Sequence, residues 1–279
     1  MVELSARIDR VPLAYVDVET TGLSPQGGDR VCEVAILRCQ GGEVIDAVQQ
    51  LVNPQRPMGA GAYAVHRISD AMLRDAPTFD AVADDVLDLL AGAVVVGHNT
   101  AFDLGFLAAE LALLGEPLPP YVALDTLRLA RRYVASPSYS LGVLAASLGV
   151  EGDGQAHRAM VDVLTTRAVL QRLVEVLWPM GVRTVEQFVA AQGGPISLER
   201  RRPVVDVPPP ILDALRLRRL LHLRYRSEWG EVTERIVEPL GVTDRGGHVS
   251  LVAHCHLRNA QRSFRLDRII EMDVIESFE

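Results

Sequence analysis

The sequence contains no lysine, so each of its 28 fixed side-chain cations is an arginine. Guanidinium groups bind phosphates bidentately and stack on bases, which favours a nucleic-acid partner. Codon usage in a GC-rich genome explains the same bias at least as well. The formal net charge of −8 argues mildly against non-specific binding to nucleic acid.

Cysteines and long apolar runs are also scarce. None of the three cysteines belongs to a CxxC pair, which favours a reduced, cytoplasmic protein. No apolar run approaches the roughly 18 residues that span a bilayer. The first residues lack the basic and apolar regions typical of a secretory signal. We therefore expect a cytoplasmic protein with no membrane partner and, with 48% hydrophobic residues, an ample core.

The charge differs between the two ends of the chain. Residues 1–199 hold 14 arginines and 24 acids, a net of −10, whereas residues 200–279 hold 14 arginines and 12 acids, a net of +2. Residues 200–210 are rich in arginine and proline, which indicates a stiff linker. We therefore predict a domain over 1–199, a linker over 200–210 and a second domain over 211–279.

The hydrophobic pattern predicts an α/β fold for the first domain. Three strands come first and are followed by alternating helices and strands, which favours a mixed sheet with helices on both faces. The predicted strands are 11–18, 30–38, 43–51, 93–97 and 122–124, and the predicted helices are 79–90, 101–114, 126–133, 139–148, 159–177 and 185–191. Beyond the linker, short strands at 220–226, 232–240, 248–256, 262–266 and 270–276 predict a small all-β barrel or sandwich.

Two acids lie at the end of the first apolar strand. Because side chains alternate along a strand, Asp17 and Glu19 share one face. Buried, unpaired carboxylates cost several kcal/mol each, and a divalent cation removes that cost because hard cations take carboxylate oxygens. A strand end that reaches solvent accounts for the pair equally well. The following turn, which contains Thr20, Gly22 and Leu23, exposes backbone N–H groups that can meet a nucleotide.

Two further acids lie in the first turns of predicted helices. Asp103 follows His98 and Asn99, and on its own it suggests only an acid at the positive end of a helix with Asn99 or Thr100 as N-cap. Asp162 follows His157, and on its own it suggests only an ion pair with the residue four positions before it.

The combination is more informative than its parts, because a mixed sheet brings the ends of these elements together. Four carboxylates and one histidine can hold two metal ions and activate a water molecule. The solution pKa of a histidine, near 6.5, suits a general base at neutral pH. We therefore expect the acids of the first domain to form a metal site.

The motif Asp17-Val18-Glu19-Thr20-Thr21-Gly22-Leu23, followed by His98-Asn99, Phe102-Asp103 and His157 five residues before Asp162, resembles the three motifs of the DEDDh exonucleases. These enzymes include the DnaQ-like proofreading subunits of bacterial DNA polymerase III. The resemblance covers about residues 10–175. It extends to the segment around His66, although Arg67 stands where glycine is usual.

This resemblance implies a ribonuclease-H-like fold, two Mg²⁺ or Mn²⁺ ions and stepwise release of nucleoside monophosphates from a 3′ end. Its implied ligands are Asp17, Glu19, Asp103 and Asp162, with His157 as the general base. Thr20 and Leu23 would contact the terminal nucleotide, with Leu23 wedged against the last base. The remaining candidates for the substrate cleft are His66, Asn99 and Phe102, and packing accounts for Phe102 equally well.

The second domain resembles a WYL domain. The resemblance rests on Leu223-Arg224-Tyr225-Arg226, Arg235-Ile236-Val237-Glu238-Pro239-Leu240 and 262–269, although Val249-Ser250-Leu251 stands in place of Trp-Tyr-Leu. It implies a small Sm-like barrel that binds nucleic acid or a nucleotide-like ligand. Arg262, Arg265 and Arg268 would form a phosphate-binding stripe on it, or simply a solvated face.

We therefore predict a metal-dependent 3′→5′ exonuclease that degrades single-stranded or frayed DNA, in repair or in proofreading beside a polymerase or repair partner. The arginine-bearing barrel leaves a second hypothesis, a regulator that binds nucleic acid without cutting it. The motifs do not separate DNA from RNA, so an exoribonuclease is a third hypothesis.

Overall fold

The computed structural model describes residues 2–150, 158–198, 207–217, 219–227, 230–245 and 248–275. The chain divides into two compact units, Met1–Leu198 and Glu199–Glu279. Among the described residues, no helix combines the length and the apolar character that crossing a bilayer requires.

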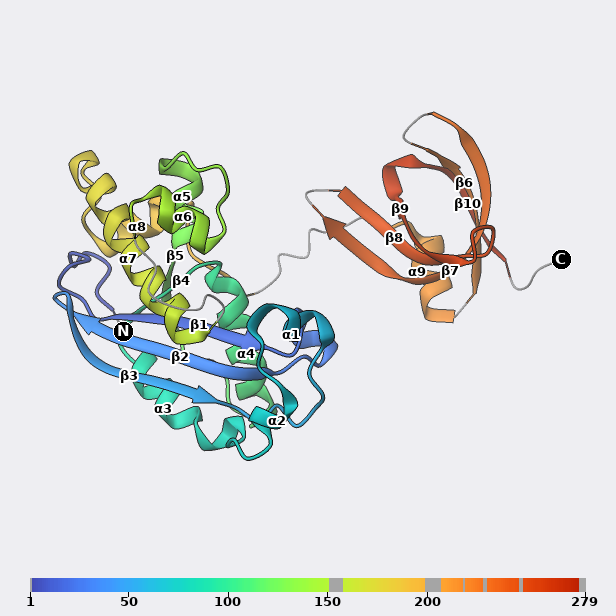
Figure 1. The fold of residues 1–279 in the computed structure, drawn as a ribbon. Coiled ribbons are helices and arrows are strands. Elements are labelled where there is room, and N and C mark those ends of the chain that lie inside the picture. Colours follow the sequence, from blue (N-terminus) through green and yellow to red (C-terminus); the bar gives the residue numbers. More distant parts are fainter. Residues whose placement is uncertain are drawn as a thin grey trace. The chain divides into compact units, whose positions relative to one another are not determined.

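The first unit is built on a five-stranded mixed sheet with the strand order β3-β2-β1-β4-β5 (Figure 1). The central strand β1 pairs antiparallel with β2 and parallel with β4, and β4 pairs parallel with β5. The strands are β1 (Leu13–Thr20), β2 (Val31–Gln40), β3 (Glu43–Leu51), β4 (Val94–Gly97) and β5 (Val122–Asp125). The predicted mixed sheet is confirmed.

Helices cover both faces of this sheet. The α-helices of the unit are α1 (Ala60–His66), α2 (Asp70–Leu73), α3 (Ala83–Leu90), α4 (Thr100–Leu113), α5 (Thr126–Tyr133), α6 (Leu141–Ser147), α7 (Ala159–Leu177) and α8 (Val185–Ala191). Alternate residues of β1 enter two different cores. Tyr15 packs with apolar residues of α5, α6, α7 and α8, whereas Val16 and Val18 pack with residues of α3 and α4. The face that carries Tyr15 therefore also carries Asp17 and Glu19, beneath α7.

In the first unit, the structure departs most from the predicted elements at 59–82. The helix predicted over 79–90 is a 3₁₀ turn, Phe79–Ala81, followed by α3, because Val82 between them adopts φ −117° and ψ −4°. The short helices α1 and α2 lie in a segment for which the sequence predicts no element.

The second unit is a five-stranded antiparallel sheet with the order β10-β6-β7-β8-β9. Its strands are β6 (Leu220–Arg226), β7 (Val232–Arg245), β8 (His248–Cys255), β9 (Ala260–Arg265) and β10 (Ile269–Ile275). Within the described residues no pairing joins β9 to β10, so the sheet is not closed into a barrel by hydrogen bonds. Its core includes Leu221, Leu223 and Phe264, together with Ile211 of the helix α9 (Pro209–Leu217).

The helix α9 overlaps the predicted linker. Prolines 208–210 indicate a stiff linker by composition, but proline also fits the first turn of a helix, where its missing N–H has no partner to lose. The structure uses Pro209 in that way. Residues 200–206 of the predicted linker lie outside the described residues.

Candidate active site

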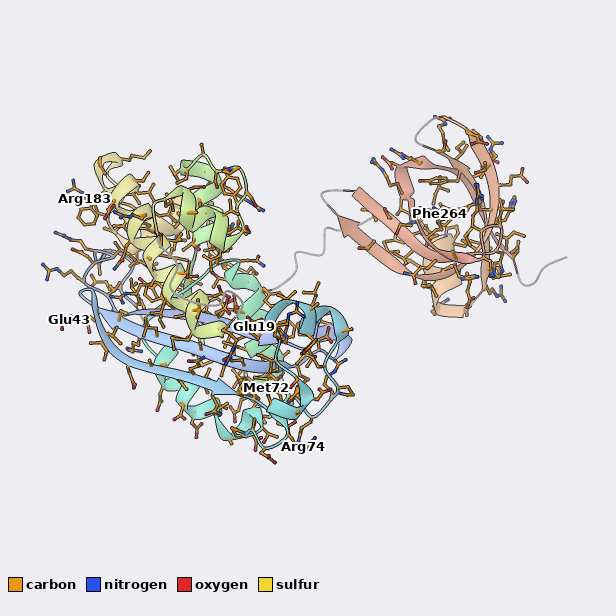
Figure 2. All side chains as sticks on the ribbon, in the orientation of Figure 1. Glu19, Glu43, Met72, Arg74, Arg183 and Phe264 are labelled. Carbon is orange, nitrogen blue, oxygen red and sulfur yellow. The ribbon has the colours of Figure 1, made fainter. Side chains whose placement is uncertain are left out.

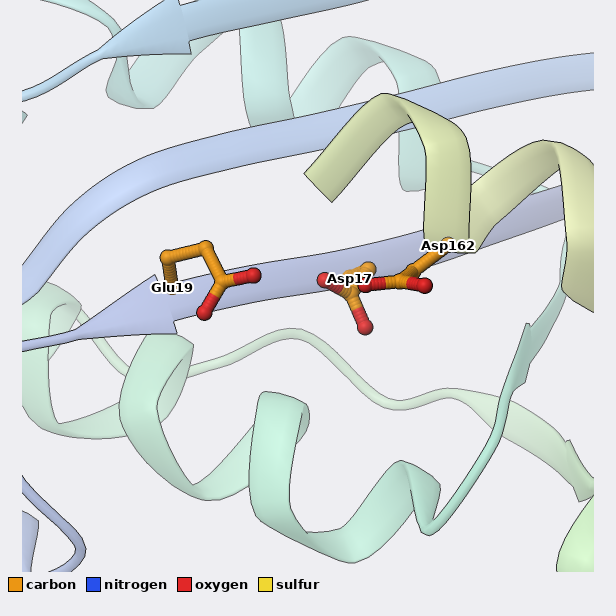
Figure 3. A group of neighbouring side chains, drawn as sticks. All are labelled: Asp17, Glu19 and Asp162. Carbon is orange, nitrogen blue, oxygen red and sulfur yellow. The ribbon is translucent and has the colours of Figure 1, made fainter. Parts of the chain in front are cut away.

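Three carboxylates meet where β1 ends beneath the first turn of α7 (Figure 3). Asp17 and Glu19 come from β1 and Asp162 from α7, and one ligand oxygen from each lies within 4.8 Å of the others. This is the convergence that the alternation of β1 and the position of Asp162 predict.

The fourth predicted ligand, Asp103, adjoins this cluster from α4. It is 3% exposed, and its Oδ1 accepts a hydrogen bond of 3.1 Å from the backbone N–H of Val18, between Asp17 and Glu19 in the chain. The charge of Asp103 is one of the causes that raise the pKa of Asp17. All four predicted carboxylates therefore gather around the end of β1.

Burial and mutual repulsion perturb these acids strongly. Burial first, and then the charges of Asp103 and Asp162, raise the pKa of Asp17 well above its ordinary value. Burial raises the pKa of Glu19 to about 8, with the charges of Asp162 and Glu33 adding to the effect. Burial also raises the pKa of Asp103, against the hydrogen bond from Val18. The fold thus concentrates acids that resist ionisation in the absence of a cation.

This donor set suits a divalent cation. Its oxygens are hard ligands of the kind that Mg²⁺ and Mn²⁺ prefer, and they lie close enough to share one ion. A cation there would favour the ionised carboxylates and so offset the burial and the repulsion that raise the three pKa values. The site therefore fits divalent metal dependence.

Sequence reasoning missed Glu33, which holds the start of α7 in place. Glu33 pairs in register with Glu19 across β1 and β2 and is 0% exposed. It accepts hydrogen bonds from the Arg158 guanidinium, at 2.8–3.3 Å, and one of 3.1 Å from the N–H of Ala159. Burial alone would raise the pKa of Glu33, but these bonds and one from Gln49 outweigh it and lower that pKa. A charged residue inside the apolar run of β2 was the available signal.

The turn after β1 carries the predicted nucleotide contacts. Leu23 is 85% exposed, whereas Thr20 is buried and its hydroxyl donates to the carbonyl of Gly22 at 2.6 Å. The ring of His66 is also buried: Nδ1 accepts from the N–H of Ile68 at 3.0 Å, and Nε2 lies 3.2 Å from the carbonyl of Thr20. His66 therefore supports the turn through its contact with the Thr20 backbone, whereas the Leu23 side chain extends from the turn into solvent.

The candidates at the start of α4 differ in their exposure. Asn99 occupies the N-cap position in a left-handed conformation, φ +74°, is exposed and makes no side-chain cap bond. Phe102 is half-buried and packs on Phe106 with ring centroids 4.9 Å apart. Asn99 is therefore available to a ligand, and Phe102 serves packing at least in part.

The remaining predicted residues are His157 and three arginines of the second unit. His157 lies outside the described residues. In the second unit, Phe264 faces the core, so alternation places Arg262 and Arg265 on opposite faces of β9. Arg265 forms a bidentate ion pair with Asp267, and Arg268 lies in the 3₁₀ turn Leu266–Arg268 that follows. The three arginines therefore do not form one stripe along β9.

Comparison with known families gives two matches. Residues 15–170 match the RNase_T family, described as "Exonuclease", and residues 206–274 match the WYL domain family.

Individual proteins agree with the first match. Over 174 residues the chain is 35% identical to "3′-5′ exonuclease DinG" of Bacillus subtilis (strain 168), covering 62% of this chain and 19% of that protein. It is also 35% identical to "DNA polymerase III subunit epsilon" of Rickettsia prowazekii (strain Madrid E), covering 53% of this chain and 67% of that protein. The chain thus spans only about a fifth of the length of DinG.

Solved structures extend the similarity to the fold. "Exonuclease X in complex with 5′ overhanging duplex DNA" superposes with a TM-score of 0.52 and 28% identity, covering 65% of this chain and 99% of that one. An E. coli ExoI–ssDNA complex superposes with a TM-score of 0.55 and 18% identity, covering 87% of this chain and 54% of that one. The second similarity concerns the fold alone.

Proposed function

The chain belongs to the RNase_T exonuclease family, and on this basis we propose that it is a metal-dependent 3′→5′ exonuclease that degrades single-stranded or frayed DNA. The observation that carries the proposal is the cluster of Asp17, Glu19 and Asp162, whose ligand oxygens lie within 4.8 Å of one another. Relatives named as exonucleases and polymerase III epsilon subunits support it. Exonuclease X, solved with duplex DNA, supports DNA as the polymer.

We assign the roles of the site residues as follows. The proposed ligands of two Mg²⁺ or Mn²⁺ ions are Asp17, Glu19, Asp103 and Asp162. When bound, such ions would activate a water and would stabilise the charge on the attacking and leaving oxygens of an in-line displacement. His157 takes the proton of the attacking water. The products are nucleoside monophosphates.

The turn after β1 orients the 3′ end. Thr20 and Leu23 hold the terminal nucleotide, with the exposed Leu23 against its base. Asn99, which is exposed, and Phe102, which is half-buried, contact the same nucleotide from α4 in this proposal. His66 acts through the Thr20 backbone that it contacts. Because cations rather than basic side chains meet the phosphate, the acidic character of residues 1–199 is consistent with this role.

The second unit binds nucleic acid or a nucleotide-like ligand in this proposal. The match to the WYL family supports it. A domain of this kind beside the nuclease favours repair, or another regulated role with a partner protein, over simple proofreading.

The decisive experiment is a substrate panel. Full-length protein with Mg²⁺ or Mn²⁺ is incubated with single-stranded DNA labelled at its 5′ end, with duplex DNA that has a frayed 3′ end, and with RNA of the same sequence. The proposal expects a ladder that shortens from the 3′ end of DNA. Faster shortening of RNA would instead favour an exoribonuclease, and tight binding without cleavage would favour the non-cleaving regulator.

A further inference from the structure

The residue after α1 is an exposed arginine in a conformation that side chains rarely adopt. Arg67 has φ +61°, in the left-handed region that favours glycine. Its backbone N–H bonds to the carbonyl of Tyr63 and so ends the helix. Glycine would make the same bond without strain. The side chain of Arg67, not its backbone, is therefore what needs an explanation.

That side chain lies against an aromatic ring. The guanidinium carbon of Arg67 is 5.9 Å from the centroid of the Tyr63 ring, within the range of a cation–π contact. Tyr63 is itself 43% exposed. Among the described residues, no carboxylate lies within ion-pair distance of Arg67. An exposed ring beside an uncompensated cation suits a single-stranded nucleic acid, whose bases stack and whose phosphates carry charge.

The helix that carries this pair is anchored to the turn after β1. His66 contacts the carbonyl of Thr20, and the N–H of Gly59 donates to the carbonyl of Thr21 at 3.2 Å. The approach is close, because a Cβ atom at position 59 would lie 2.4 Å from that carbonyl oxygen. The helix α1 and its last-turn neighbours Tyr63 and Arg67 are therefore fixed to the turn proposed to hold the terminal nucleotide.

We propose that Tyr63 and Arg67 bind the DNA strand next to its terminal nucleotide, with Tyr63 stacking on a base and Arg67 pairing with a phosphate. This inference rests on the proposed function, because the terminal nucleotide defines where the strand enters. It adds a contact to the strand itself, outside the residues assigned to the reaction.

The test uses a second arginine–aromatic pair of the same unit as its control. Arg183 is exposed and lies over the Trp178 ring at 5.4 Å, and Figure 2 shows it well away from Glu19. The full-length variants Arg67→Gln and Arg183→Gln lose the same charge. Binding of a fluorescent oligo(dT) is measured against salt in EDTA, and kcat and KM in Mn²⁺ are measured on oligo(dT) and on the p-nitrophenyl ester of thymidine 5′-phosphate, which has one nucleotide.

We expect Arg67→Gln to weaken oligo(dT) binding and to reduce the salt slope by about 0.7, the value for one phosphate contact on a single strand. Tyr63→Ala should weaken binding about fivefold or more, as for one lost base stack, without changing the slope. Arg67 and Tyr63 variants should raise KM for oligo(dT) and leave the one-nucleotide ester unaffected. Arg183→Gln should change none of these values.

Stability separates this role from a structural one. Arg67→Gly relieves the strained backbone, so its melting temperature should be no lower than that of the wild type while its binding is weakened. Equal effects of Arg67→Gln and Arg183→Gln, or unchanged binding of both Arg67 variants, would overturn the inference. Absence of cleavage in Mn²⁺ with the expected binding changes would instead refute the proposed nuclease and retain the contact. A wild-type chain that binds no oligo(dT) in EDTA and shortens none in Mn²⁺ would refute both.

Discussion

The first unit contains a pair of fully buried carboxylates and, at the end of β1, a pair of half-buried carboxylates, and the two pairs have different partners. Glu33 and Glu110, 0% and 3% exposed, are each held by two nitrogens of one arginine and by a backbone N–H. Among the described residues, no arginine lies within ion-pair distance of Asp17 or Glu19. An arginine therefore neutralises each acid of the fully buried pair, which has a structural role. The acids of β1 have no such partner in the described part of the chain and can be neutralised by a cation from solution.

The contrast is sharpest between Glu19 and Glu33, which face each other across β1 and β2. Burial raises the pKa of Glu19 to about 8, and the charge of Arg158 only partly offsets this. Burial also acts on Glu33, but the hydrogen bonds from Arg158, Gln49 and Ala159 lower its pKa. Burial alone therefore does not distinguish a structural acid from a candidate metal ligand. The difference is whether an arginine and a backbone N–H donate hydrogen bonds to the carboxylate.

The largest expected effect is that of Asp17→Asn. Loss of a principal electrostatic stabiliser should lower the rate of DNA hydrolysis by on the order of 10³-fold. In metal-free buffer the same change should raise the melting temperature above pH 7, because it removes an acid whose ionisation the folded site opposes. Retained cleavage, or a melting temperature lower than that of the wild type, would contradict the distinction between the acids of β1 and the acids paired with arginine.

The next effect concerns the acid that holds α7. Glu33→Gln removes the charge that binds Arg158, so the first turn of α7 and Asp162 lose part of their support. We expect kcat/KM to fall by about 10–100-fold, the range for groups that orient metal ligands. In contrast to Asp17→Asn, the metal-free protein should become less stable, by about 1–3 kcal/mol, because hydrogen bonds to a charged group are lost. Urea denaturation measures this change.

A moderate effect is the pH dependence of stability in EDTA. Below pH 4.5 the Glu19 carboxyl is protonated in both the folded and the unfolded state, so Glu19 does not destabilise the fold there. Between pH 4.5 and about 8 only the unfolded chain ionises, so stability is lost as pH rises.

Asp17 and Asp103 act in the same direction as Glu19. The melting temperature should therefore fall by at least about 2–4 °C over this window, the shift that roughly 1 kcal/mol produces. Mn²⁺ should reverse the trend by holding the ligands ionised. Glu19→Gln is the matched control and should make the fall smaller, with the remainder due to Asp17 and Asp103; an equal fall in that variant would exclude Glu19 as a source.

The smallest effect on activity is expected for Glu110→Gln. The substitution matches Glu33→Gln in chemistry, but the partners of Glu110 are Arg30 and Val31, not the start of α7. Its stability should fall by a similar amount, about 1–3 kcal/mol, with kcat/KM unchanged. A loss of activity as large as that of Glu33→Gln would show that general destabilisation explains both.

Sequence patterns predict local features of the site well. Alternation along β1 predicts that Asp17 and Glu19 share a face, and the helix starts place Asp103 and Asp162 in first turns. The partner of Glu33 was beyond prediction, because Arg158 lies 125 residues further along the chain and depends on the strand register.

Short elements account for most of the remaining differences. Helices α1 and α2, of seven and four residues, are too short to show a helical period. As a result the sequence predicts no helix at the position of Tyr63 and Arg67. In the second unit, alternation within the predicted strand 262–266 already separates Arg262 from Arg265. The structure adds that Arg268 lies beyond β9, in the following 3₁₀ turn.

The most direct measurement is the anomalous X-ray scattering of crystals soaked in Mn²⁺ and a short oligo(dT). We predict an Mn²⁺ peak coordinated by Asp17, Glu19 and Asp162, and none beside Glu33 or Glu110. Saturating Mn²⁺ that leaves no peak among the three β1 and α7 carboxylates would contradict the account.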